Sequence, residues 1–224
     1  MATPDLFSRT FAAVIFDNDG TLVDSSGSVE RSWMKWAREH EVDPHRLSGH
    51  HGMPAAAIIE SVASHVDPVA ALARIEQLEV ADVEGVAALP GVLDALAALE
   101  PRDGDGARHT IATSATRVLA ETRLRAAGIA IPPTLVAVDD VARGKPNPDP
   151  YLLTAQRLGV DPGDCLVCED AASGISAARA AGCAVLAVRT TSTVEELSDA
   201  DLVIGSLADV SFVRDGERVR ITPA

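Results

Sequence analysis

The chain has 224 residues, 47% of them hydrophobic and only 3% aromatic, which is enough for one domain with a modest insert. Its formal charge of −14 disfavours nucleic acids and anionic membrane surfaces as partners, and no apolar run reaches transmembrane length. The cysteines number three (Cys165, Cys168 and Cys183) and no secretory h-region is visible, so we expect a reduced, cytoplasmic location.

The first predicted element is a buried strand over Phe11–Phe16, six apolar residues that stop at an acidic cluster. Asp17 and Asp19 follow at its carboxyl end, which is where ligands bind in open α/β sheets. Because alternate residues of an extended segment point the same way, both carboxylates can face one spot. Mg²⁺ suits such oxygen ligands and leaves room for a phosphate. A solvated turn is the alternative, since Asp, Asn and Gly are common in turns.

Helices are predicted next. Trp33 and Trp36 recur at helical spacing, and two more helices are expected over residues 54–64 and 67–80. These helices would form a small all-helical module inserted after the first strand. The predicted domains are therefore the helical insert, residues 25–88, and a main domain made of residues 1–24 and 89–224.

Strands and helices alternate from Pro90 onward. The further predicted strands are His109–Thr113, Thr134–Val138, Cys165–Cys168, Ala184–Val188 and Asp201–Ile204. The helices between them are Arg117–Ala127, Pro150–Leu158 and Ser173–Ala181. This alternation predicts an α/β fold, a Rossmann-like parallel sheet with helices on both faces. Near the C-terminus, Arg214–Ile221 could be an edge strand or a hairpin.

Polar residues follow three of these strands. Ser114 and the backbone N–H groups beside it lie at a helix start and could bind a phosphate or only cap the helix. Lys145 lies in a proline-rich loop, where its ammonium suits a contact to a phosphoryl oxygen, although a surface lysine is the alternative. Glu169 and Asp170 end another strand, or they cap the next helix.

The order of these groups is informative. Four short segments contain the polar residues at the strand ends and in the proline-rich loop. In chain order they are Asp17-Asn18-Asp19-Gly20-Thr21, Thr113-Ser114-Ala115, Gly144-Lys145-Pro146-Asn147-Pro148 and Glu169-Asp170-Ala171. Together they resemble the four motifs of the haloacid dehalogenase-like hydrolases, and the helical insert resembles the C1-type cap of that family. More narrowly, the chain is similar to the sugar-phosphatase and glycerol-3-phosphatase branch of the β-phosphoglucomutase-like subfamily. This similarity is carried by Val29–Trp33, the His51-Gly52 loop, and Glu84-Gly85 before Leu89-Pro90-Gly91.

The resemblance implies a Mg²⁺-dependent phosphatase that hydrolyses small phosphate monoesters through an aspartyl-phosphate intermediate. The implied catalytic residues are Asp17 as nucleophile, Asp19 as general acid and base, and Ser114 and Lys145 as phosphate contacts. The implied Mg²⁺ ligands are Asp17, the backbone carbonyl of Asp19, and Asp170, with Glu169 as a ligand or as a neighbour of the ligands. The implied substrate-binding residues are Asn18, Thr21, Thr113, Ala115, His51, Gly52 and Glu84.

The expected partner is a small phosphorylated metabolite, and the protein is expected to act as a monomer. Met53 stands where members of the branch often carry Lys or Arg, so we expect sugar, hexitol or glycerol monophosphates to be preferred over bisphosphates. Two alternatives stay open at this point. A phosphomutase would return the phosphoryl group to a second hydroxyl, and a catalytically silent binding protein could use the same fold.

Overall fold

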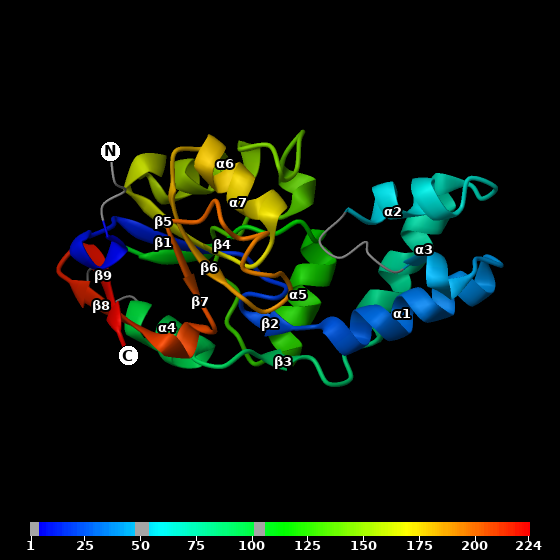
Figure 1. The fold of residues 1–224 in the computed structure, drawn as a ribbon, viewed down its shortest axis with the longest axis horizontal. Coiled ribbons are helices and arrows are strands. Elements are labelled where there is room, and N and C mark those ends of the chain that lie inside the picture. Colours follow the sequence, from blue (N-terminus) through cyan, green and yellow to red (C-terminus); the bar gives the residue numbers. More distant parts are fainter. Residues whose placement is uncertain (1–4, 48–53, 101–105) are drawn as a thin grey trace.

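A five-stranded parallel sheet forms the centre of the main body in the computed structural model, which describes residues 5–47, 54–100 and 106–224 (Figure 1). The strands, in their spatial order, are β4 (His109–Ile111), β1 (Ala13–Phe16), β5 (Cys165–Glu169), β6 (Ala184–Val188) and β7 (Leu202–Ile204). Every residue of β1, β5 and β6 is buried, which explains the unbroken apolar runs in the sequence. The predicted α/β fold with a parallel sheet is confirmed.

One predicted strand, Thr134–Val138, is wrong as a strand. This segment makes a single parallel bridge, between Val136 and Ala112 beside β4. Prolines 132 and 133 directly before it have no N–H to donate to a ladder. After it the chain turns into a short 3₁₀ helix at Val138–Asp140, where the carboxylate of Asp140 accepts the N–H of Ala137 at 2.9 Å.

Helices cover both faces of the sheet. Alternate residues Ala13 and Ile15 of β1 pack against α6 (Asp149–Leu158) and α7 (Ala172–Ala180), which lie above the sheet in Figure 1. Val14 and Phe16 face the other way. Their cluster includes residues of α4 (Val92–Leu99), α5 (Arg117–Ala126) and a C-terminal hairpin. That hairpin, β8 (Val210–Asp215) and β9 (Arg218–Pro223), is a separate two-stranded sheet, so one of the two predicted forms for this region is confirmed.

Three helices stand apart from the main body at the right of Figure 1, and we call them the helical module: α1 (Ser26–Glu39), α2 (Ala55–Val62) and α3 (Pro68–Ala81). The module has an apolar cluster of its own, in which the rings of Trp33 and Trp36 meet edge to face at 5.4 Å. The indole N–H of Trp36 donates to the carbonyl of Ala71 at 2.9 Å, which ties α1 to α3. Both tryptophans therefore serve packing, since they belong to this cluster and the N–H of Trp36 is satisfied inside the module.

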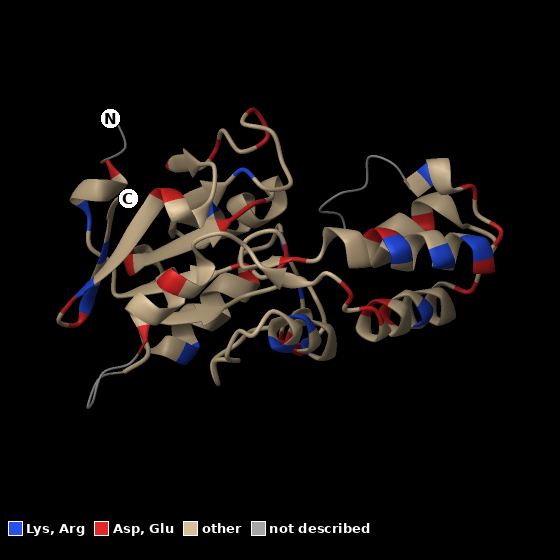
Figure 2. Cartoon of the chain, turned by 90° about the horizontal axis from the view of Figure 1, so that it is seen from below, with Lys and Arg blue, Asp and Glu red and all other residues tan. Residues whose placement is uncertain are grey.

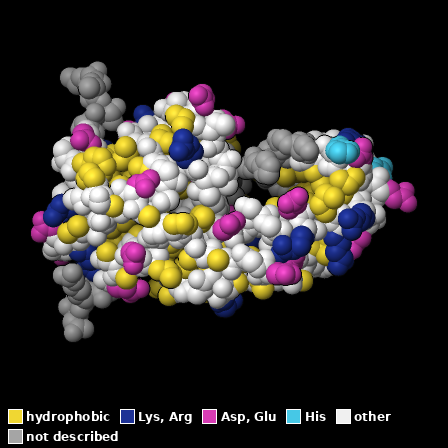
Figure 3. All heavy atoms as spheres, turned by 60° about the horizontal axis from the view of Figure 1, so that its bottom comes forward, with side chains coloured by type: hydrophobic (Ala, Val, Ile, Leu, Met, Phe, Trp, Pro, Cys, Tyr) yellow, Lys and Arg dark blue, Asp and Glu magenta, His cyan; other side chains and the backbone are white. Residues whose placement is uncertain are grey.

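Two short strands, β2 (Val23–Asp24) and β3 (Ala87–Ala88), pair antiparallel where the chain enters and leaves the module. They lie at the predicted boundaries between the main domain and the helical insert, after residues 24 and 88. The assignment of two domains stays a prediction. Figure 3 shows the module projecting to one side of the main body, and Figure 2 shows acidic and basic residues interspersed along its helices. Among the described residues, no helix is long and apolar enough to cross a membrane.

Gly91 lies directly before α4, with a φ of 81°, and its close packing can be tested by mutation. A Cβ on it would lie 2.2 Å from the backbone nitrogen of Ala208, so Gly91→Ala should lower the free energy of unfolding by about 3 kcal/mol or more. Gly128 is the matched control, because its φ is 71° but a Cβ there meets nothing within 4 Å. Gly128→Ala should cost only about 1 kcal/mol. Urea unfolding measures both, and equal losses would contradict the packing argument.

Candidate active site

The acids predicted at two strand ends meet at one edge of the sheet. Asp17 follows β1 and Glu169 ends β5, and these strands are neighbours with Phe16 opposite Cys168. Asp17, Glu169 and Asp170 each offer one carboxylate oxygen, and all three atoms lie within 4.8 Å of one another. Three of the predicted ligand residues are thus brought together.

Lys145 is the cation within this group. Its side chain is 3% exposed, and Nζ lies 2.5 Å from Asp17 Oδ1, 2.7 Å from Glu169 Oε1 and 3.0 Å from the carbonyl oxygen of Ala112. An ammonium has three hydrogens to donate, and these three acceptors match them. The Lys145–Pro146 peptide bond is cis. A surface lysine, the alternative that the sequence left open, is excluded.

Both oxygens of Glu169 carry two hydrogen bonds. Oε1 accepts from Lys145 and from the hydroxyl of Tyr151 at 3.0 Å. Oε2 accepts the backbone N–H groups of Asp170 and Ala171, each at 2.9 Å. Four donors fill the acceptor capacity of a carboxylate. Glu169 is therefore a fixed anchor for Lys145.

Two glycines make room for these carboxylates. A Cβ on Gly174 would lie 1.6 Å from Glu169 Oε1, and a Cβ on Gly20 would lie 2.1 Å from Asp170 Oδ2. Gly20 also has a φ of 85°, which a larger residue adopts only with strain. The acids can approach one another only because both positions lack a side chain.

Asp170 is held by two threonine hydroxyls. Thr21 donates to Oδ1 at 3.4 Å, and Thr191 donates to Oδ2. Thr21 was predicted as a substrate-binding residue, and here it contacts an acid instead. Thr191 was missed. The available signal was its position shortly after the predicted strand Ala184–Val188, at the same edge of the sheet.

The local charge is unbalanced, because three buried carboxylates face one ammonium. Burial raises the pKa of Asp17 to about 7, although the charge of Lys145 opposes this shift. Burial, together with the charges of Glu169 and Asp17, raises the pKa of Asp170 well above its usual range. Burial lowers the pKa of Lys145, but Asp17 and Glu169 outweigh it and hold that pKa well above its ordinary value. A divalent cation with oxygen ligands fits this excess of negative charge.

Asp19 lies beside this group, with a side chain 26% exposed. Its Oδ1 accepts the hydroxyl of Ser25 at 2.7 Å and lies 3.0 Å from Nη1 of Arg123, while its Oδ2 accepts the side-chain amide of Asn18 at 3.2 Å. Asn18, predicted to bind substrate, is fully buried and contacts Asp19. Sequence reasoning missed Arg123. Its place beside buried Leu124 on an amphipathic helix was the only hint.

Among the described residues, the run Thr113-Ser114-Ala115 and the remaining predicted substrate contacts make few interactions with the buried acids. Ser114 is exposed at the sheet edge, and buried Thr113 accepts the N–H of Ala115 at 3.0 Å. Glu84 is exposed, and its backbone carbonyl accepts from Arg31 at 2.6 Å. The predicted substrate contacts His51 and Gly52, with Met53, lie outside the described residues.

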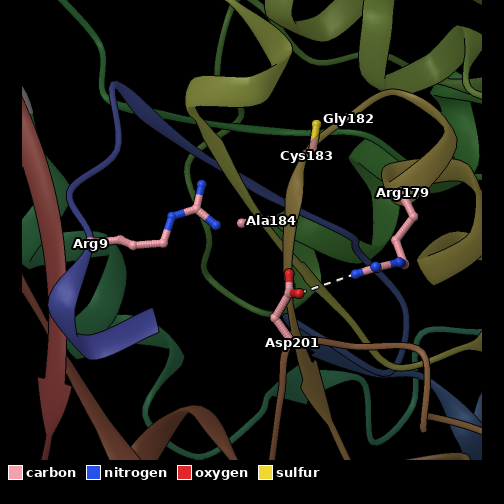
Figure 4. Close-up of a pocket in the computed structure, with 6 residues that line it drawn as sticks. All are labelled: Arg9, Arg179, Gly182, Cys183, Ala184 and Asp201. Carbon is pink, nitrogen blue, oxygen red and sulfur yellow. Dashed lines mark hydrogen bonds and ion pairs between the residues drawn. The ribbon is translucent and has the colours of Figure 1, made fainter. Parts of the chain in front are cut away.

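A cavity of about 240 Å³ lies at the opposite edge of the sheet (Figure 4). It is lined by Arg9, Arg179, Gly182, Cys183, Ala184 and Asp201. Ala184 begins β6, whereas the acids follow the carboxyl ends of the strands, and Arg179 is already paired with Asp201 at 3.1 Å. This cavity is separate from the acidic site.

Comparison with known proteins identifies the family. Residues 11–182 match the haloacid dehalogenase-like hydrolases, and the chain belongs to this family. Hexitol phosphatase A of Escherichia coli is 40% identical over 89% of this chain and 93% of its own length. A fructose-1-phosphate phosphatase of Escherichia coli is 35% identical over 80% of this chain and 97% of its own length.

Among solved structures, a β-phosphoglucomutase from Clostridium difficile superimposes with a TM-score of 0.72, over 88% of this chain and 92% of that one. Its sequence identity is 23%, so this likeness supports the shared fold alone. The resemblance of the motifs to the haloacid dehalogenase-like hydrolases is confirmed.

The raised pKa of Asp17 predicts how the metal-free protein responds to pH. Between pH 3.8 and about 7 the folded state holds a proton on Asp17 that the unfolded chain releases, so this group's contribution to stability falls as pH rises. Asp17→Asn removes that titration. In EDTA, the variant should therefore gain stability relative to wild type from pH 5 to pH 8, by roughly 1 to 4 kcal/mol. Urea unfolding at several pH values measures the difference, and a constant difference would contradict the shift.

Proposed function

We propose that this protein is a Mg²⁺-dependent phosphatase that hydrolyses small phosphate monoesters, such as sugar, hexitol or glycerol phosphates, through an aspartyl-phosphate on Asp17. The observation that carries the proposal is the buried set of Asp17, Asp170, Glu169 and Lys145 at the carboxyl edge of β1 and β5. The phosphatases named among its relatives support the same reaction class.

In the metal site that we propose, Asp17, Asp170 and the backbone carbonyl of Asp19 hold Mg²⁺. Bound there, the ion would neutralise negative charge on the transferring phosphoryl group. Glu169 would not be a direct ligand, because four donors already fill its oxygens. Its role would be to hold Lys145 against Asp17.

Two displacements at phosphorus complete the proposed reaction. A carboxylate oxygen of Asp17 forms a bond to phosphorus, the ester P–O bond breaks, and Asp19 gives its proton to the departing alkoxide. A water then attacks the phosphorus of the aspartyl-phosphate, Asp19 takes a proton from that water, and the carboxylate of Asp17 is released with inorganic phosphate. Ser114 would bind a phosphoryl oxygen that does not react, and Lys145 would do so by exchanging one of the three acceptors that it now holds.

The choice of substrate would come from the helical module, because the sheet edge contacts only the phosphate. The acid Glu79 of α3 lies near Asp19, because Arg123 pairs with both of them. A second phosphate on the substrate would meet like charge there. We therefore propose a preference for monophosphates with an uncharged body over bisphosphates. No observation favours a phosphomutase or a silent binding protein over this assignment.

Asp17→Asn tests the nucleophile. The change is nearly isosteric but removes the attacking charge, so kcat for a hexitol phosphate with Mg²⁺ should fall by about 10³-fold or more while the circular dichroism spectrum stays native. Asp24→Asn, an exposed acid on β2, is the matched control and should keep its activity. Retention of substantial turnover by the Asp17 variant would rule out the covalent route.

Asp19→Asn tests the acid and base. For an alkyl phosphate such as a hexitol phosphate, kcat/KM should fall by about 10²-fold or more, because its alkoxide must be protonated as it leaves. For an aryl phosphate such as p-nitrophenyl phosphate, whose leaving group needs little protonation, the loss in kcat/KM should be much smaller. Equal losses for the two esters would count against a role in proton transfer.

A further inference from the structure

A buried guanidinium connects Asp19 to the helical module. Arg123, on α5, places Nη1 3.0 Å from Oδ1 of Asp19 and Nη2 3.5 Å from Oε1 of Glu79, on α3 of the module. The Arg123 side chain is 5% exposed and that of Glu79 is 11% exposed. One cation from the main body thus lies between an acid of the candidate site and an acid of the module.

Fold stability alone is a poor explanation for this arrangement. Nε of Arg123 is buried and has no hydrogen-bond partner among the described residues, and its Nη2 has only the ion pair with Glu79 at 3.5 Å, so burying this guanidinium is costly. The contact between α3 and α5 also does not depend on Arg123, because the hydroxyl of Thr116 donates to Glu76 at 2.5 Å across the same junction. The placement of Arg123 is better explained by what it does to Asp19.

The two oxygens of Asp19 are made unequal by their partners. Oδ1 accepts the hydroxyl of Ser25 at 2.7 Å and is paired with the guanidinium of Arg123, whose Nη1 lies 3.0 Å away. Oδ2 takes only the amide of Asn18, at 3.2 Å. Oδ1 thus faces a donating hydroxyl and a positive charge, which leaves Oδ2 as the oxygen with fewer partners.

We infer that Arg123 is a positioning residue for the general acid and base. By holding Oδ1 of Asp19 it leaves Oδ2 as the oxygen that gives a proton to the leaving group and later takes one from water. Glu79 holds Arg123 in turn, so a residue of the helical module fixes the orientation of Asp19 through one intermediate. This inference rests on the proposed phosphatase function, because it assigns an orientation to the acid that the function requires.

The test compares hexitol phosphate, an alkyl ester, with p-nitrophenyl phosphate, an aryl ester, in kcat/KM with saturating Mg²⁺. Arg123→Met keeps much of the volume and removes the charge. It should lower kcat/KM for the alkyl ester by about 10- to 100-fold and for the aryl ester by no more than about 3-fold, because only the alkyl ester depends on a well-placed proton donor. Arg123→Lys should restore part of the alkyl activity, since the charge returns without the planar fork.

Two further variants separate positioning from packing. Glu79→Gln should show a smaller loss with the same alkyl selectivity. Glu76→Gln, which alters the same α3–α5 junction without touching Arg123, should leave both esters within about 2-fold of wild type. Combining Arg123→Met with Asp19→Asn should add less than about 2-fold to the loss from Asp19→Asn alone, because the two residues act through one proton. Thermal unfolding of each variant records its stability.

Equal losses for the two esters, or losses that multiply in the double variant, would overturn the inference. Alkyl-selective loss in Glu76→Gln as large as that in Glu79→Gln would overturn the role of Glu79. If Arg123→Met does not fold, Arg123→Lys and Glu79→Gln carry the same comparison of the two esters. Wild-type protein that hydrolyses neither ester would overturn the proposed function and this inference with it, whereas active wild type with unselective variants overturns the inference alone.

Discussion

The ammonium of Lys145 lies inside the protein between Asp17 and Glu169, and the rest of the candidate site depends on this contact. A charge buried alone would cost several kcal/mol, and the same holds for each carboxylate. Together they are tolerated because each supplies the partner that the other needs. The contact also joins the end of β1, the end of β5 and the loop before α6. The pairing of β1 with β5 brings the charged groups together, and their attraction in turn holds these three segments in place.

Asp19 is governed by a different set of partners. The buried acids contact the sheet edge and the loop before α6, whereas Asp19 is held by Ser25, at the start of the helical module, and by Arg123, on a helix of the main body. In the proposed mechanism, the groups that act on the phosphate and the group that transfers the proton are therefore held from two directions. A change in the module can reach Asp19 without disturbing the buried acids, because the two sets of contacts do not share a side chain.

The sequence predicts much of this site for a simple reason. Asp17, Lys145 and Asp170 belong to short runs with a fixed spacing from a strand or a proline-rich loop, and parallel strands bring their carboxyl ends together. Arg123 and Thr191 have no such local marker, because what makes them part of the site is a contact between elements far apart in the chain. The strand expected at Thr134–Val138 failed for a related reason. Its composition favours a strand, but the prolines before it and the carboxylate of Asp140 after it leave room for one bridge only.

The pairing of β2 with β3 places the two covalent links of the helical module side by side. An insertion whose ends are neighbours can be lengthened, shortened or exchanged without altering the distance that the host loop must span. If the module chooses the substrate as proposed, the residues that do so can diverge during evolution while the reacting centre is inherited intact. Proteins built this way would share the sequence of the reacting centre, and their differences in substrate choice would lie in the inserted helices.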